Sequence, residues 1–172
     1  IASYGANTGS TTTAGLYAFG VEGTNPVSDR ALGWVASNAL TGGTGTGKGY
    51  VGWRIRNNTG STIESITVTW TGEQWLRQNN ASAHTLELDY QVGNLVTDLT
   101  AGTWTSASSM FTSPITGGSG TTLLDGNASA NRVVDIEAII SGLSIAPNQE
   151  IMLRWVDLNN TDNDHVMAID DV

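Results

Sequence analysis

The chain has 172 residues, a formal net charge of −9 and no cysteine. The negative charge argues against nucleic acid and anionic membranes as partners, because proteins bind both through Lys and Arg, and no apolar run is long enough for membrane insertion. The missing cysteines exclude disulfides, thiolate chemistry and Cys-based zinc sites. The length suits a single domain over residues 1–172.

Short runs of alternating apolar and polar residues recur along the chain. Such alternation places one face of a strand on a core and the other in water. We predict strands over residues 16–19, 32–35, 50–56, 65–70, 84–92, 133–140, 151–156 and 168–172. Runs of Gly, Asn and Pro separate them, residues 41–49 form a long flexible loop, and no segment has helical apolar spacing. The pattern predicts an all-β, antiparallel β-sandwich of the jelly-roll type.

The aromatic residues supply most of the expected core. Four of the six tryptophans fall on apolar strand faces, and we expect them to be buried: Trp34, Trp53, Trp70 and Trp155. His84 also lies on an apolar face and is expected to be a hydrogen-bonded core histidine. Trp104 fits either the core or the surface.

The last sixteen residues, DLNNTDNDHVMAIDDV, contain five aspartates and no Lys or Arg. Carboxylates that lie close together repel each other unless a cation sits among them, and calcium binds six to eight oxygen atoms. The spacing predicts a calcium site formed by Asp157, Asn159, Asp162, Asp164 and Asp171. The alternative is a solvated turn held by Asx hydrogen bonds. We expect His165, in the same stretch, to be a surface residue.

Several polar residues and one tryptophan fall on outward-facing or loop positions. Carbohydrate sites combine an aromatic ring with planar carboxylate, amide and guanidinium groups. The residue types therefore predict a carbohydrate-binding surface formed by Arg54, Arg56, Glu73, Trp75, Arg77, Glu87 and Asp89. The alternative is that the charged residues form cross-strand ion pairs and that Trp75 belongs to the core.

Four segments resemble motifs of secreted bacterial lectin-like and MAM-like jelly-roll modules, which are β-sandwiches similar to carbohydrate-binding modules. The segments are 28–33 (SDRALG), 56–63 (RNNTGSTI), 71–75 (TGEQW) and 168–172 (AIDDV). The resemblance implies secretion and, by analogy of fold, a role connected with glycans. Because the sequence is still strand-like at Val172, we expect the domain to be part of a larger extracellular protein.

The combined expectation is a non-catalytic extracellular module that binds polysaccharide or a cell-surface glycan and is stabilised by calcium. One alternative is a structural adhesin or filament subunit that self-associates through β-strand contacts.

The other alternative is a glycoside hydrolase of the jelly-roll type. Residues 87–91 (ELDYQ) resemble the E-x-D-x-E strand of laminarinase-like glucanases, but Gln91 replaces the third acid. Glu73 and Glu87 remain a possible pair of catalytic acids, and the sequence does not set the distance between them.

Overall fold

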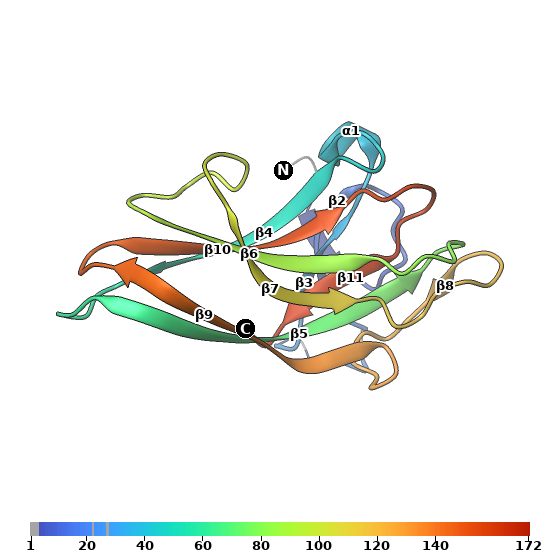
Figure 1. The fold of residues 1–172 in the computed structure, drawn as a ribbon. Helices are drawn as coiled ribbons and strands as arrows, with labels where there is room; N and C mark the ends of the chain where they lie inside the picture. Colours follow the sequence, from blue (N-terminus) through green and yellow to red (C-terminus); the bar gives the residue numbers. More distant parts are fainter. Residues whose placement is uncertain (1–3, 22, 27) are drawn as a thin grey trace.

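The computed structural model describes residues 4–21, 23–26 and 28–172. It is an all-β fold with two sheets and a single short helical turn, α1 (Asn38–Thr41), which lies in a segment that the sequence left without a helix. Figure 1 shows the two sheets packed face to face and joined by loops at both ends. Among the described residues, no helix has the length and apolarity needed to cross a membrane.

The smaller sheet has four strands and is antiparallel throughout, as expected. Its order is β4 (Lys48–Arg56), β10 (Glu150–Leu158), β6 (Thr85–Gly93) and β7 (Thr105–Thr112). Leu153 of β10 pairs with Trp53 on one side and Tyr90 on the other, and Arg154 pairs with Gly52 and Asp89. The predicted alternation therefore places Leu153 toward the second sheet and Arg154 on the outer face.

The larger sheet has seven strands. Six of them follow in the order β1 (Tyr4–Asn7), β2 (Gly15–Phe19), β3 (Ala31–Val35), β11 (Val166–Asp170), β5 (Ile63–Arg77) and β8 (Thr122–Leu123). The seventh, β9 (Arg132–Ile145), pairs along β5. Because β1 runs parallel to β2, this sheet is mixed, and the expectation of a purely antiparallel sandwich is wrong at that edge.

Eight of the eleven strands match predicted segments, and three do not. The strands β1, β7 and β8 were not expected. The sequence of β7, TSASSMFT, consists mainly of small hydroxyl-bearing residues that give little hydrophobic contrast between its two faces. The strand β5 continues to Arg77, whereas the predicted strand ends at residue 70. Residues 71–76 are buried on both faces, so they do not show the alternation from which the strand was predicted.

Two hydrophobic clusters stabilise the fold. The first lies between the sheets, where the rings of Trp70 and Trp155 meet edge to face at 5.9 Å. The second contains residues of β2, β3 and the second half of β5, and there Phe19 stacks on Trp75 at 5.8 Å. The strand β5 contributes to both, because Trp70 and Trp75 point to opposite faces of the larger sheet.

Three of the five residues expected in the core are buried, and the other two are not. Trp70, Trp155 and His84 are buried, which confirms the expectation. Trp53 is 48 % exposed, so its assignment to the core is wrong. It points inward from β4, but β4 is an edge strand, so the ring is open to solvent on one side.

Trp34 and His165 also depart from their expected positions. Trp34 is only half-buried, and its Nε1 donates a hydrogen bond to the backbone oxygen of Tyr50 at 2.9 Å. His165, expected at the surface, is 1 % exposed, and its ring lies 4.6 Å from that of His84, centre to centre, at a tilt of 32°. A polar residue in an acidic turn is thus part of the interior.

Replacing Leu153 by Ala should lower the free energy of unfolding by about 2–5 kcal/mol, because the residue is fully buried between the sheets and the change leaves a cavity. Urea denaturation followed by tryptophan fluorescence measures the loss. Leu123→Ala, at an exposed position on β8, is the matched control and should change the stability by less than about 0.5 kcal/mol. Equal losses in the two variants would contradict the assignment of the core.

Candidate functional site

The five C-terminal aspartates do not form one cluster. Asp157 and Asp164 lie where β10 ends and β11 is about to begin, whereas Asp171 follows the far end of β11. The five residues of β11 separate the two groups by roughly 16 Å at the rise of an extended strand. Asp171 instead accepts a hydrogen bond from the Thr71 hydroxyl at 3.4 Å. Its inclusion in the predicted calcium site is therefore wrong.

Three of the predicted metal ligands do come together. Asn159, Asp162 and Asp164 line one polar cleft of about 470 Å³, which we call the acidic-turn cleft. Its other lining residues are Thr12, Val35, Ala36, Ser37, Asn38, Thr44, Gln78, Asn163 and Val166. The cleft thus contains carboxylate, amide and hydroxyl oxygens, and it lies between the segment around α1 and the turn that follows β10.

Hydrogen bonds hold the two walls of the acidic-turn cleft in place. The side-chain amide of Asn159 donates to Asn38 Oδ1 and to the backbone oxygen of Gly42, both at 2.9 Å. Asp164 Oδ1 accepts the backbone N–H of Asn160 at 2.7 Å. Asp162 is exposed and has a positive φ of 68°, which places it at the tip of the turn. The carboxylates are therefore presented by a structured turn.

Behind the cleft lies a buried group of titratable side chains. Burial, followed by the nearby Asp164 carboxyl group, raises the pKa of Asp157 well above its usual value. Burial, followed by the neighbouring His165, lowers the pKa of His84 to about 4. His84 Nδ1 accepts the backbone N–H of His165 at 3.1 Å, and His165 Nδ1 accepts that of Gln78 at the same distance. Both imidazoles thus serve as neutral structural acceptors.

The donor set of the acidic-turn cleft suits calcium better than a transition metal. No group of three or more His, Asp or Glu residues is spaced to hold a metal ion among the residues that the structure describes. A cation in the cleft would therefore rely on two carboxylates, Asp162 and Asp164, and on the side-chain oxygen of Asn159. Backbone oxygens or water would have to complete the shell, as calcium sites allow.

Four of the predicted carbohydrate-binding residues share the outer face of the smaller sheet. Arg54 and Arg56 project from β4, and Glu87 and Asp89 project from β6, with β10 between the two strands. We call this surface, together with Arg154, Tyr50 and Trp104, the polar face. Arg54 is 3.9 Å from Glu150, and Arg56 donates to Asn148 at 2.9 Å.

Arg154 organises the centre of the polar face. It is 7 % exposed and donates from Nε and Nη2 to Asp89 Oδ2, at 3.1 and 2.9 Å. The guanidinium lies 4.7 Å from the ring centre of Tyr50 and 4.0 Å from that of Trp104, which are favourable cation–π distances. A further hydrogen bond to the backbone oxygen of Leu99 fastens the 94–104 loop to the sheet.

The sequence places Arg154 on the outer side of a predicted strand but does not reveal its partners. Two cross-strand ion pairs agree with the alternative considered for this surface: Asp89 of β6 pairs with Arg154 of β10, and Arg54 of β4 pairs with Glu150 of β10.

The remaining three predicted carbohydrate-binding residues lie elsewhere. Trp75 is fully buried against Phe19, so its ring has no free face on which a sugar can stack, and its assignment as a binding platform is wrong. Glu73 is 1 % exposed. Arg77 donates to the backbone oxygen of Gly117 and to the Thr122 hydroxyl, which commits its guanidinium to the neighbouring loop.

Glu73 is a buried acid in an unusual electrostatic environment. Its Oε2 accepts the indole N–H of Trp75 at 3.0 Å, while its Oε1 is buried without a hydrogen-bond partner. Burial, followed by the nearby Asp170 carboxyl group, raises the pKa of Glu73 to about 7. Glu87 is exposed and belongs to the other sheet. The two residues therefore do not form the acid pair that a glycosidase places on either side of a scissile bond.

Comparisons of the chain with protein-family models, with curated proteins and with solved structures give no match. The functional argument therefore depends on the geometry of the acidic-turn cleft, the polar face and the remaining surface of the molecule.

The raised pKa of Glu73 predicts a characteristic pH dependence. In the unfolded chain the group titrates near 4.5, and in the folded chain near 7, so its stabilising contribution is complete below pH 4.5 and is lost as the pH rises through 7. Glu73→Gln, which imitates the protonated acid, should therefore gain stability relative to the wild type between pH 4.5 and 7, by about 3 kcal/mol at most.

Chemical denaturation of both proteins at half-unit pH intervals measures this difference. The exposed substitution Glu137→Gln is the matched control for the loss of one negative charge. A difference between Glu73→Gln and the wild type that stays constant from pH 4 to pH 8 would contradict the assignment.

Proposed function

We propose that this chain is a non-catalytic, extracellular module of the jelly-roll type that binds carbohydrate on its polar face. The observation that carries the proposal is the convergence of Arg54, Arg56, Glu87 and Asp89 on one outer sheet surface, around an arginine held between two aromatic rings. A polysaccharide or cell-surface glycan is the corresponding ligand.

The chemistry of the polar face matches the hydrogen-bonding needs of a glycan. The Arg54 side chain is 45 % exposed and offers donors, while the exposed Glu87 offers acceptors. Adjacent sugar hydroxyls bond in pairs to planar groups of this kind. Trp104 is partly exposed where the 94–104 loop meets the sheet, and it supplies an aromatic surface for the C–H groups of a sugar ring. Arg154 and Asp89 already form hydrogen bonds with each other, so their role in this proposal is to hold the binding surface rigid.

A glycan array followed by isothermal titration calorimetry tests this proposal. We expect binding of at least one neutral or basic polysaccharide, and we expect the double variant Arg54→Ala/Glu87→Ala to weaken it at least tenfold, equivalent to about 1.4 kcal/mol. The matched control is Arg132→Ala/Glu137→Ala, which removes the same charges from β9. Binding that is equally strong in both double variants would rule out the polar face. The absence of binding across the array would rule out the carbohydrate function.

We further propose that calcium binds in the acidic-turn cleft and stabilises the fold. The support is that Asn159, Asp162 and Asp164 line one polar cleft. The buried Asp157 lies close enough to Asp164 for the two carboxyl groups to repel each other when both are charged. A divalent cation would offset that repulsion and would tie the turn after β10 to the segment around α1.

Thermal melts in excess EDTA, with calcium added back and with magnesium in its place, test this second proposal. Calcium should raise the melting temperature by several degrees through binding to the folded state, and magnesium should have a smaller effect. The variant Asp162→Asn should reduce the calcium-dependent shift, whereas Asp135→Asn, at an exposed turn-like position with positive φ on β9, should retain it. Identical melting curves with EDTA and with calcium would mean that the acidic stretch is a solvated turn.

A further inference from the structure

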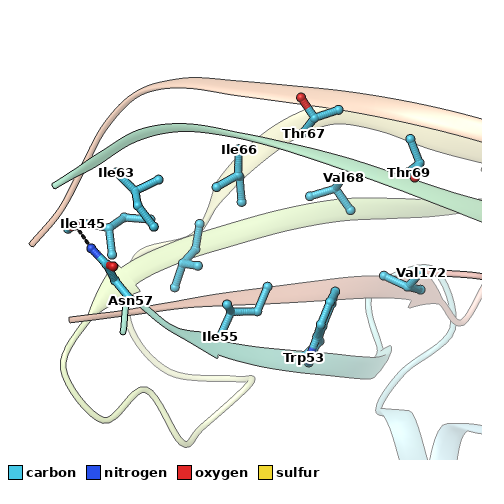
Figure 2. A pocket seen from close by; sticks show the side chains of 11 residues that line it. Trp53, Ile55, Asn57, Ile63, Ile66, Thr67, Val68, Thr69, Ile145 and Val172 are labelled. Carbon is cyan, nitrogen blue, oxygen red and sulfur yellow. Dashed lines mark hydrogen bonds between the residues drawn. The ribbon is translucent and has the colours of Figure 1, made fainter. Parts of the chain in front are cut away.

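An apolar groove of about 280 Å³ opens between the two sheets on the side of β4 and the first half of β5. In Figure 2, Ile63, Ile66 and Val68 point from β5 toward β4, while Trp53 and Ile55 extend from β4 toward β5. Its remaining lining residues are Asn57, Thr67, Thr69, Ile145, Ile151 and Val172. The volume is nearly twice the ~150 Å³ of an engineered cavity that binds benzene, so it can accept two or more aliphatic side chains.

The groove offers little chemistry other than apolar contact. Its one side-chain amide, that of Asn57, already donates to the backbone oxygens of Ile145 and Ser61, at 2.7 and 2.9 Å. The groove contains no titratable side chain. It is therefore neither an active site nor a site for a polar ligand.

Unpaired strand edges border the groove. Residues 71–76 of β5 pair with β11 on one side, but within the described chain residues 63–70 pair with β9 alone. In an antiparallel strand, alternate residues direct both backbone hydrogen-bonding groups to the same side. The edge of β5 that faces the groove thus carries unused donors and acceptors in line with β11. On the opposite wall, β4 pairs with β10 alone among the strands that the structure describes.

The apolar surface continues beyond the groove. Trp53 and Val172 also line a neighbouring depression that reaches Leu32, and Leu32 in turn lines another with Leu16 and Tyr4. Tyr4, Trp53, Val172 and Leu32 are all among the exposed large hydrophobic residues. A continuous exposed apolar surface of this kind marks an interaction site in a protein that is otherwise rich in polar surface residues.

We propose that the groove is a docking site for an extended strand of another polypeptide chain. The strand adds to β5 antiparallel over residues 63–70, in line with β11, and places alternate Val or Ile side chains into the groove. Main-chain hydrogen bonds to a free sheet edge supply affinity in this mode of recognition, and pockets for alternate side chains supply specificity. This inference is independent of carbohydrate binding, because the polar face lies on the outer side of the smaller sheet.

Charge favours a partner of different sequence over a second copy. The neighbouring depression, which shares Trp53 and Val172 with the groove, carries Asp170 and Asp171 against one arginine, Arg30, and the whole chain has a net charge of −9. Two copies would bring this negative charge together, whereas a strand preceded by Lys or Arg would reduce it. The occupant is thus an alternately aliphatic segment with a basic residue at the end that meets Asp171.

A synthetic peptide of sequence Lys-Val-Thr-Val-Thr-Val-Thr serves as the probe. Trp53 lies in the groove and is half-exposed, so occupation should produce a saturable blue shift of its fluorescence. The control peptide Lys-Val-Val-Val-Thr-Thr-Thr has the same composition without the alternation and should bind at least tenfold more weakly. The variant Trp53→Phe identifies the part of the signal that comes from this ring.

Matched substitutions on the protein locate the binding. Ile66→Asp should weaken the peptide at least tenfold, because it places a charge among the apolar lining residues, and Ile66→Thr should have a smaller effect with less risk to folding. Ile139→Asp, on β9 at an exposed position, should leave binding unchanged. Circular dichroism melts confirm that each variant is folded before it is titrated.

Four results would overturn the proposal. The first is the absence of a blue shift at millimolar peptide. The second is binding that Ile66→Asp and Ile66→Thr leave intact. The third is a concentration-dependent dimer in sedimentation experiments that Ile66→Asp abolishes, which would make a second copy the occupant. If the peptide binds only when fused after Val172, and never as a separate chain, a separate partner chain is likewise ruled out.

Discussion

The length of β5 is the constraint on which the rest of this structure depends. Its fifteen residues pair with β9 along most of one side, but β11 covers only its second half on the other. The second half is therefore buried on both faces, and its Trp75 and Leu76 belong to the second hydrophobic cluster. The first half contributes to the core with one face and leaves an open edge beside the groove. A fully buried segment and a free backbone edge thus belong to one strand.

Neighbouring residues of β5 have different surroundings on the two faces of the strand. A side-chain carbon at Gly72 would lie 2.2 Å from the Phe111 ring, so only glycine lets β5 approach the smaller sheet there. One residue later, Glu73 faces the second cluster. Its Oε2 accepts a hydrogen bond from the Trp75 indole, and its Oε1 has no hydrogen-bond partner among the described residues. A buried acid with a pKa near neutrality follows from this placement.

The sequence indicates which residues alternate but not which strands lie at an edge. Alternation correctly placed Leu153, Trp155 and Trp70 inside and Arg54 and Glu87 outside, because period two alone decides these positions. Alternation failed for Trp53: the side chain points inward, but it remains exposed because β4 lies at the edge of its sheet. Trp75, which lies beyond the predicted strand and was assigned to the binding surface, faces outward from the larger sheet but is covered by the loops that contain Gly9 and Gly126.

The candidate calcium ligands show the same limit of sequence reasoning. Asn159, Asp162 and Asp164 meet because a single turn contains them, so local spacing was sufficient. Asp171 is separated from them because β11 extends away from the turn. Five residues in an extended strand span a long distance, although Asp164 and Asp171 are close in the sequence. The partners of Arg154 can be identified only from the register of three strands and the position of the 94–104 loop. A pattern of residue types contains neither.

Figure 1 places the end of the chain beside the middle of β5, where the edge of that strand becomes free. The open edge is the central claim of this account, and amide hydrogen exchange tests it most directly. The account predicts that alternate amides between residues 63 and 70 exchange rapidly in the isolated protein, while those of residues 71–76 are protected through β9 and β11. Uniform protection from residue 63 to residue 76 would contradict it, because the edge would then already be closed.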